Sequence, residues 1–301
     1  MLFTLLLPLF LLSALGCLLA KSRWLAAGWF TGVNELTVKL LIPALLFNGA
    51  YANGLPAAIS WQVLAAYYLP LLLLFLLVAF AFKRSENKAE RALAATFSNT
   101  VFVGIPVLTL AFGNASLQYA FPIIAFHGLI AFTLYYLLAS AGGRGKPKLL
   151  AALANTIKNP IVVSLLAGLL FNATGIVLPH PFTQILEMLS AAALPCALLV
   201  LGASLANFHL QSKTETAVVV LAKLFVLPSL VLLLAVFVLH LPAAASSVLV
   251  LLAACPVGVN VSAVIQGDGK NPAMASSAIL LSSLACIVTM PVWLWILSHL
   301  T

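Results

Sequence analysis

Charged residues are scarce in this chain of 301 residues: Asp, Glu, Lys and Arg make up only 7% of it. Six residues are acidic, and Asp268 is the one aspartate, which excludes the paired-aspartate motif of prenyl-transferring enzymes. The chain also lacks a His-Glu-x-x-His motif and a P-loop. Gly202-Ala203-Ser204-Leu205-Ala206 falls within an expected helix, so it is no nucleophile elbow. We therefore expect no enzyme, and ATP-driven transport would need another subunit.

Cysteine is also rare. The four cysteines (Cys17, Cys196, Cys255 and Cys286) all lie in apolar stretches, without metal-ligand spacing and without histidines nearby. This pattern excludes a disulfide framework and a zinc site, and it is typical of small buried apolar residues. We expect no metal site and no cofactor.

Apolar residues, in contrast, make up 64% of the chain, whereas soluble domains have about 45–50%. This composition predicts a polytopic membrane protein, because about 20 mainly apolar residues cross a bilayer as a helix. No basic residue precedes the first apolar segment, so we interpret it as a retained helix rather than a signal peptide. The ten predicted spans are 2–20, 28–51, 61–82, 92–112, 117–140, 150–174, 183–206, 214–240, 243–265 and 273–299.

The basic residues indicate the topology. All but Lys39 and Lys223 follow odd-numbered spans, with Lys158 at the far edge of the loop after the fifth, and the loops after even-numbered spans carry none. The positive-inside rule then places the odd-numbered loops in the cytoplasm and both termini outside, in a bacterial inner membrane. The net charge of +8 therefore indicates topology and contact with anionic membrane lipid rather than binding of nucleic acid.

Two spans contain Asn, Gly and Pro in their middle: 98–106 reads SNTVFVGIP and 255–262 reads CPVGVNVS. Proline and glycine weaken helices, so we expect each span to break near Pro106 and Pro256. Broken backbone at membrane depth is tolerated where it lines a cavity, and matching breaks in two halves point to a transporter's substrate site.

The predicted fold class is all-α integral membrane, with ten transmembrane helices in two inverted five-helix repeats and crossing broken helices 4 and 9. Because five is odd, the two halves enter the membrane from opposite sides. Residues 1–140 form the first repeat, 141–148 a cytoplasmic linker and 149–301 the second repeat. Similar motifs occur in both halves: the segment around Pro43 resembles that around Pro195, and the segment around Pro70 resembles that around Pro228.

A half-helix that starts near the midplane points free N–H groups and a positive partial charge at the cavity, which suits an anion. The amides of Asn99 and Asn260 can donate to a carboxylate. The alternative is that both asparagines only satisfy the broken backbone, and Ser98 and Ser262 are weaker candidates because hydroxyls often bond their own helix. The predicted substrate-binding residues are Asn99, Thr100, Gly104, Pro106, Pro256, Gly258 and Asn260.

Four ionisable residues inside spans are candidates for coupling or gating. Glu35 and Lys39 share a helix face and form either a structural pair or a gating pair. His127 is either a packing residue or a proton carrier. Lys223 has no acid nearby in sequence and either pairs with Glu35, attracts an anion or extends to the cytoplasm.

The motifs resemble one family over the whole chain. That family is the auxin efflux carrier family. The motifs that resemble it are residues 39–47 (KLLIPALLF), Ser98-Asn99-Thr100 followed by Gly104-Ile105-Pro106-Val107, Leu194-Pro195 with Gly202–Leu205, and Pro256 with Asn260. That family includes plant auxin exporters and bacterial malonate and organic-anion permeases. The long loop of many plant members is absent, so the chain resembles the compact bacterial form.

The resemblance implies a scaffold of spans 1, 2, 6 and 7, a transport domain of spans 3–5 and 8–10, and elevator-type movement. It also implies that asparagines beside the crossover bind a carboxylate, and that the protein forms a homodimer. The plant carriers have an acidic residue in the third helix, within a cation-like site. Residues 61–82 contain none, so the resemblance does not extend to that site.

We therefore predict a secondary active transporter of small organic anions, such as malonate or an auxin-like acid. The coupling ion, H+ or Na+ if there is one, stays open. The alternatives are a sodium- or proton-coupled symporter or exchanger of related crossover fold, and a channel- or receptor-like membrane protein. No carboxylate lies beside Pro106 or Pro256, which argues against a cation exchanger.

Overall fold

The structure is a computed structural model that describes the chain except residues 1, 23, 27, 55–60, 141–158, 207, 209, 211–213 and 301. The predicted linker 141–148 and the start of the sixth span lie outside the described residues. All regular secondary structure in the described part is helical, apart from a single isolated β-bridge between Ser98 and Val257.

The helices follow the predicted spans closely. In the first half they are α1 (Leu2–Lys21), α2 (Trp29–Leu36), the π-helix η1 (Thr37–Leu41), α3 (Ile42–Asn53), α4 (Trp61–Ala81), α5 (Lys88–Thr96), the π-helix η2 (Thr100–Gly104), α6 (Ile105–Phe112), the short η3 (Asn114–Ser116) and α7 (Leu117–Ser140). In the second half they are α9 (Pro160–Thr174), α10 (His180–Ala206), α11 (Thr214–Leu221), the π-helix η4 (Ala222–Val226), α12 (Leu227–Leu232), the π-helix η5 (Leu233–Val238), α13 (Ala243–Ala254), α14 (Asn260–Gly267) and α15 (Ala273–Leu300).

Among the described residues, six helices are long and apolar enough to cross a membrane. Four shorter apolar helices accompany them, and two of these, Thr100–Phe112 and Ala243–Ala254, are halves of the interrupted fourth and ninth segments. Many large apolar side chains on these helices face outward, as lipid-facing side chains do. The chain is a multi-pass membrane protein.

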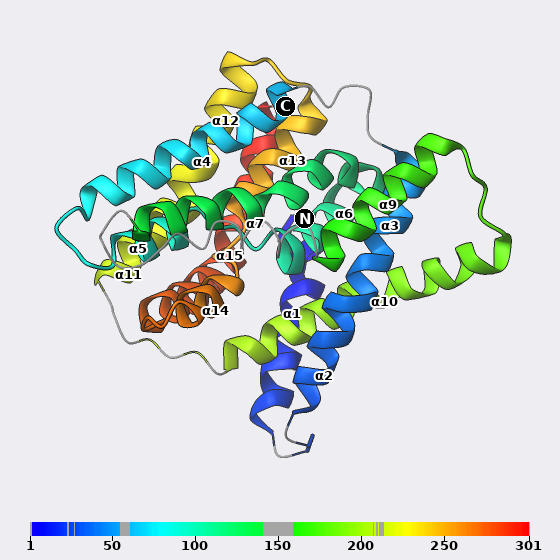
Figure 1. Cartoon of the computed structure of the whole chain (residues 1–301), viewed down its shortest axis with the longest axis horizontal. Coiled ribbons are helices and arrows are strands. Elements are labelled where there is room, and N and C mark those ends of the chain that lie inside the picture. Colours follow the sequence, from blue (N-terminus) through cyan, green and yellow to red (C-terminus); the bar gives the residue numbers. More distant parts are fainter. Residues whose placement is uncertain are drawn as a thin grey trace.

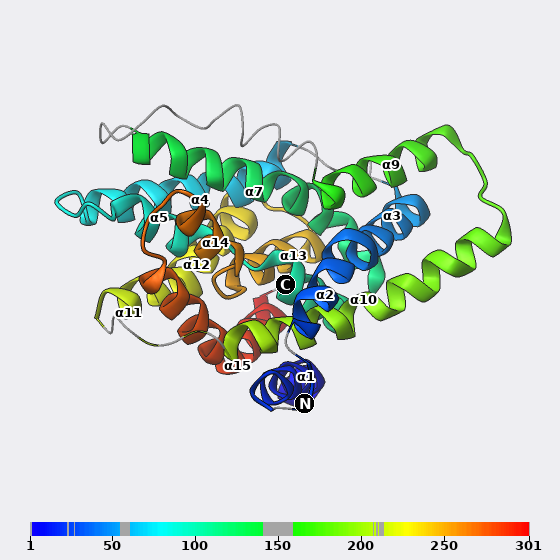
Figure 2. The same cartoon turned by 60° about the horizontal axis from the view of Figure 1, so that its bottom comes forward.

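The helices gather into two groups (Figures 1 and 2). One group contains α1, α2, α3, α9 and α10, in which α10 packs along α1 and α3 along α9. The other contains α4, α5, α7 and α11–α15. The closest approach in the first group is between α1 and α10, where Gly16 faces the backbone of Leu199 and Gly202 faces that of Ser13. Small residues allow backbones to approach in this way inside membranes.

Both predicted interruptions occur, but the first is not at Pro106. The fourth segment leaves helical geometry at Phe97–Asn99, and Pro106 lies within the first turn of α6. The residue before it, Ile105, donates its N–H five residues back to Thr100, so the wide π-turn η2 accommodates the proline. The same turn precedes Pro43 and Pro228, where Ile42 and Leu227 also donate five residues back.

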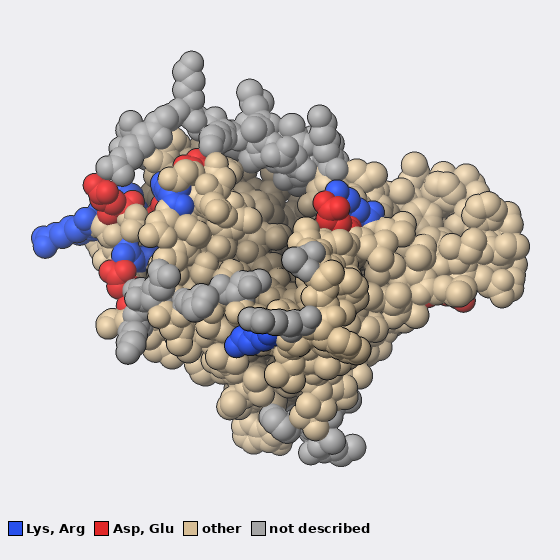
Figure 3. Space-filling view, turned by 90° about the horizontal axis from the view of Figure 1, so that it is seen from below, with Lys and Arg blue, Asp and Glu red and all other residues tan. Residues whose placement is uncertain are grey.

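Ionic contacts join three loops at one end of the second group. Arg91 at the start of α5 pairs with Glu215 at the start of α11 at 2.5 Å, and Lys270 pairs with the buried Glu90 at 2.5 Å. The contacts bring the starts of α5 and α11 and the loop before α15 to one side of the molecule. Figure 3 shows the largest gathering of charged groups at the left end of this face, with smaller charged groups nearer its middle.

Candidate functional site

The two interrupted segments meet and pair through their backbones. The N–H of Asn99 donates to the carbonyl of Pro256 at 2.9 Å, and the N–H of Gly258 donates to the carbonyl of Phe97 at 3.0 Å. The bonds are related as if by a two-fold axis between Ser98 and Val257, and each segment supplies one donor and one acceptor. A side chain on Gly258 would meet the ring of Phe97 at 2.5 Å, so only glycine permits this approach. We call these paired residues, 97–99 and 256–258, the crossover.

The remaining N–H groups of the two bridge residues are bound by side chains from the next segment in each half. Ser98 donates its N–H to His127 Nε2 of α7 at 2.9 Å, and Val257 donates its N–H to Ser282 Oγ of α15 at 3.0 Å. The ring of His127 is buried and stacks on Phe97. Because Nε2 accepts this bond, it carries no proton in this arrangement. The structure thus places His127 in direct contact with the crossover.

We expect His127→Leu to destabilise the protein by about 1–3 kcal/mol, because the N–H of Ser98 would be buried without an acceptor. His127→Gln can supply an oxygen acceptor and should cost less. Thermal unfolding of both purified variants in detergent checks this order. A His127→Leu variant as stable as His127→Gln would contradict it.

Asn99 lies where the second half of the interrupted segment begins. Its side-chain oxygen accepts the N–H of Phe102 at 3.2 Å and so caps η2. The side chain is only 4% exposed, yet its amide nitrogen Nδ2 has no hydrogen-bond partner among the described residues. A buried amide donor without a partner is costly, which indicates a ligand or water that completes it.

A cavity of about 510 Å³ adjoins the crossover. We call it the crossover cavity. It lies between the two groups of helices and is lined from both. The first group contributes Asn34, Glu35, Val38, Lys39, Asn159, Ile161, Val200, Leu201 and Ser204, and the interrupted segments contribute Phe97–Phe102 and Gly258–Asn260, with Phe208 completing the lining.

Four of the seven predicted substrate-binding residues line this cavity: Asn99, Thr100, Gly258 and Asn260. They are the first residues of the two half-helices η2–α6 and α14 or lie next to them, where backbone N–H groups have no acceptor within the helix. Asn260 is exposed to the cavity, unlike the buried Asn99. The positive ends of two helices therefore face one space.

The other three predicted residues lie elsewhere. Gly104 packs against α13, where an added side chain would meet Leu252 at 2.8 Å, and Pro106 is buried in α6. Pro256 lines a separate, mainly apolar cavity of about 500 Å³ between α1, α10, α6 and α15. The weaker candidate Ser262 bonds Ser276 instead, whereas Ser98 lines the crossover cavity and accepts from Tyr67.

Glu35 and Lys39 both line the crossover cavity and pair at 3.3 Å, with side chains 61% and 68% exposed. Their charges cancel. The net attraction for an anion therefore comes from the amides and the helix ends rather than from a free cation in the lining. Lys223 does not line this cavity and does not pair with Glu35, because its ammonium is buried against the carbonyl of Ala253.

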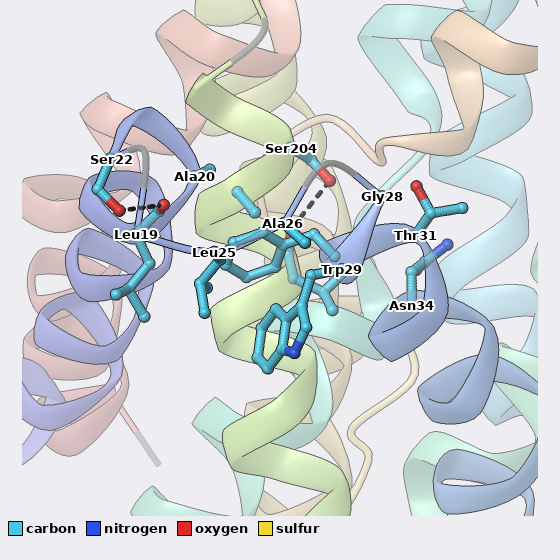
Figure 4. A pocket seen from close by; sticks show the side chains of 13 residues that line it. Leu19, Ala20, Ser22, Leu25, Ala26, Gly28, Trp29, Thr31, Asn34 and Ser204 are labelled. Carbon is cyan, nitrogen blue, oxygen red and sulfur yellow. Dashed lines mark hydrogen bonds between the residues drawn. The ribbon is translucent and has the colours of Figure 1, made fainter.

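An outer pocket of about 570 Å³ continues from the crossover cavity, and the two share Asn34, Val200 and Ser204. Figure 4 shows Leu19 and Ser22 of the α1 end on one side of it, Thr31 and Asn34 of α2 on the other, and Trp29 and Ser204 between them. The pocket adjoins the loop between α1 and α2, which follows an odd-numbered span. Together the two pockets extend from the crossover to that loop.

Sequence reasoning missed three polar lining residues: Asn34, Asn159 and Ser204. Asn159 precedes Pro160 and caps α9 by accepting from Ile161 at 3.0 Å, a signal that indicated a helix start but not a cavity. Asn34 and Ser204 had no local signal, because only packing of α2 against α10 brings them to the cavity. Among the described residues no group of His, Cys, Asp and Glu could hold a metal ion.

Known membrane transporters are similar to this chain along nearly its whole length. The family model described as "Membrane transport protein" matches residues 1–294. A Rhizobium meliloti (strain 1021) protein named "Putative malonate transporter" is 29% identical over 302 residues, covering 95% of this chain and 92% of that protein. The Escherichia coli (strain K12) "Uncharacterized transporter YfdV" is 24% identical over 307 residues, covering 97% of this chain and 96% of that protein. Because the family model spans nearly the whole chain, this protein belongs to the membrane transport protein family, the auxin efflux carrier family that its motifs resemble, and is a membrane transporter rather than an enzyme.

Proposed function

We propose that this protein is a secondary active transporter of small organic anions, and that the crossover cavity holds the carboxylate. The observation that carries the proposal is the unpartnered, buried amide nitrogen of Asn99, a residue that lines a cavity faced by the starts of two half-helices. A carboxylate there would accept from Nδ2 of Asn99 and from the side-chain amide of Asn260, at the positive ends of the two half-helices. The name of the Rhizobium relative makes malonate the first anion to test.

The proposed architecture is ten membrane spans in two inverted repeats of five, with the crossover on their common axis. The reciprocal bonds between residues 97–99 and 256–258 support this, and so do the matching roles of His127 and Ser282. An odd number of spans per repeat inverts the second half.

Transport proceeds by movement of one group of helices against the other. The group with α1, α2, α3, α9 and α10 is the scaffold, and the group with the crossover is the moving body. The cavity lies between the two, as alternating access requires. The ion pairs of Arg91 with Glu215 and of Lys270 with Glu90 hold the moving body together across its two halves.

The odd-numbered loops face the cytoplasm of a bacterial inner membrane, because they carry nearly all the basic residues. Both chain termini then lie outside. Because the outer pocket adjoins the loop after the first proposed span, the cavity would face the cytoplasm in this orientation.

Purified protein in liposomes provides the test. We expect saturable uptake of radiolabelled malonate and acceleration by unlabelled malonate on the opposite side, which a carrier shows and a channel does not. Asn260→Ala should weaken uptake several-fold, because it removes one donor from the cavity. Failure of malonate and of a panel of mono- and dicarboxylates to be taken up or to raise the melting temperature would refute the proposal.

A further inference from the structure

Lys223 is a buried cation without an anionic partner. Its side chain has no exposed area, although it lies in the middle of an apolar segment. All six acidic residues of the chain are described, and none is within ion-pair distance of it. A lone ammonium at membrane depth is costly, so its surroundings must compensate the charge.

The compensation comes from the C-terminal end of α13. Lys223 Nζ donates to the carbonyl of Ala253 at 2.5 Å. In a continuous helix that carbonyl would accept the N–H of Val257, but Val257 donates to Ser282 because the segment breaks there. The last carbonyls of a helix carry a partial negative charge, and a cation beside them is stabilised.

The backbone around Lys223 is shaped for this contact. The residue lies in η4, a π-helical turn, and such turns often occur at functional sites. The neighbouring carbonyl of Leu224 is bound by Trp293 Nε1 of α15 at 2.9 Å. The first bond joins η4 to α13 and the second joins it to α15, so the turn that carries Lys223 is held by two neighbouring helices.

We propose that Lys223 is a tethered cation that fills a cation site next to the crossover, formed by the carbonyl end of α13. In other transporters with interrupted helices, the carbonyls at half-helix ends bind the coupling Na+. Here the protein supplies the cation itself. The ammonium neutralises the negative end of α13, which leaves the positive ends of η2–α6 and α14 to act on the anion. Lys223 is thus a positioning residue, and transport requires no sodium.

This inference deepens the proposed function, and its transport test rests on that function. In liposomes, malonate uptake by the wild type should stay within twofold when choline replaces Na+. Lys223→Ala should reduce uptake at least tenfold in choline, and n-propylammonium, which matches the atoms removed, should restore a large part of it. Lys223→Met fills the same space without a charge, so it should be equally slow and not restored. Lys83→Met makes the same change on an exposed loop and should transport like the wild type.

A second measurement needs no substrate. n-Propylammonium should raise the melting temperature of Lys223→Ala and leave those of the wild type and Lys223→Met unchanged. Lys223→Met should stay folded, because an apolar side chain avoids the cost of a buried charge. Sodium-dependent uptake by the wild type, wild-type uptake by Lys223→Met, or no specific stabilisation of Lys223→Ala by n-propylammonium would each overturn the inference. If malonate is not transported at all, only the proposed function fails, and the melting temperatures still decide the role of Lys223.

Discussion

Replacing Asn99 with aspartate should lower anion uptake at least 100-fold while the crossover stays folded. Aspartate keeps the side-chain oxygen that accepts the N–H of Phe102, so η2 remains capped. It loses the Nδ2 donor and places a negative charge where the carboxylate would bind. Two like charges about 4 Å apart at an effective dielectric of about 20 repel by about 4 kcal/mol, which exceeds a 100-fold loss.

The measurement is uptake of radiolabelled malonate at equal amounts of reconstituted protein, together with the melting temperature. Asn87→Asp is the matched control, because Asn87 precedes α5 far from the cavity and makes no capping bond. Normal uptake by Asn99→Asp would place the anion elsewhere. Asn99 would then serve only the backbone, which was the alternative interpretation of this residue.

Gly202→Ala should reduce the amount of folded protein more than any other glycine-to-alanine substitution in the first helix group. The added methyl would come 1.7 Å from the carbonyl oxygen of Ser13, and a backbone atom cannot move aside as a side chain can. The helices α1 and α10 would have to separate along their whole contact. We expect a loss of about 3 kcal/mol or more, at the upper end of overpacking effects.

Recovery of monodisperse protein in detergent and its melting temperature check this prediction. Gly32→Ala is the matched control, since Gly32 lies in α2 of the same helix group and has no atom within 4 Å of the added methyl. Equal recovery of both variants would show that the approach of α1 to α10 is not required for folding.

The two interruptions show how far local signals reach. Asn, Gly and Pro within apolar segments correctly indicated that both segments break, and that the breaks belong together. The first break lies at Phe97–Asn99 rather than at Pro106, because the π-turn η2 accommodates the proline ring without ending the helix. At Pro256 the helix does end nearby, at Ala254, because no such turn precedes that proline.

The two asparagines also differ in a way that their sequence motifs concealed. The reciprocal bonds of the crossover align Asn99 with Gly258, so Asn260 lies two residues beyond the equivalent position. Asn99 is consequently a buried cap with a free donor, whereas Asn260 is exposed to the cavity. Spacing along one chain could not reveal this, because the alignment is set by hydrogen bonds between residues about 160 positions apart.

The sequence by itself determined that this is a multi-pass membrane protein with two interrupted spans, because the bilayer imposes segment length and apolar content directly on the residues. Only the tertiary structure decided which polar groups meet. His127 and Ser282 receive the N–H groups of the crossover, Lys223 binds the end of α13, and Asn34 and Ser204 reach the cavity. These contacts depend on helix packing, and inside a membrane packing must satisfy every polar group that the broken backbone leaves unpaired.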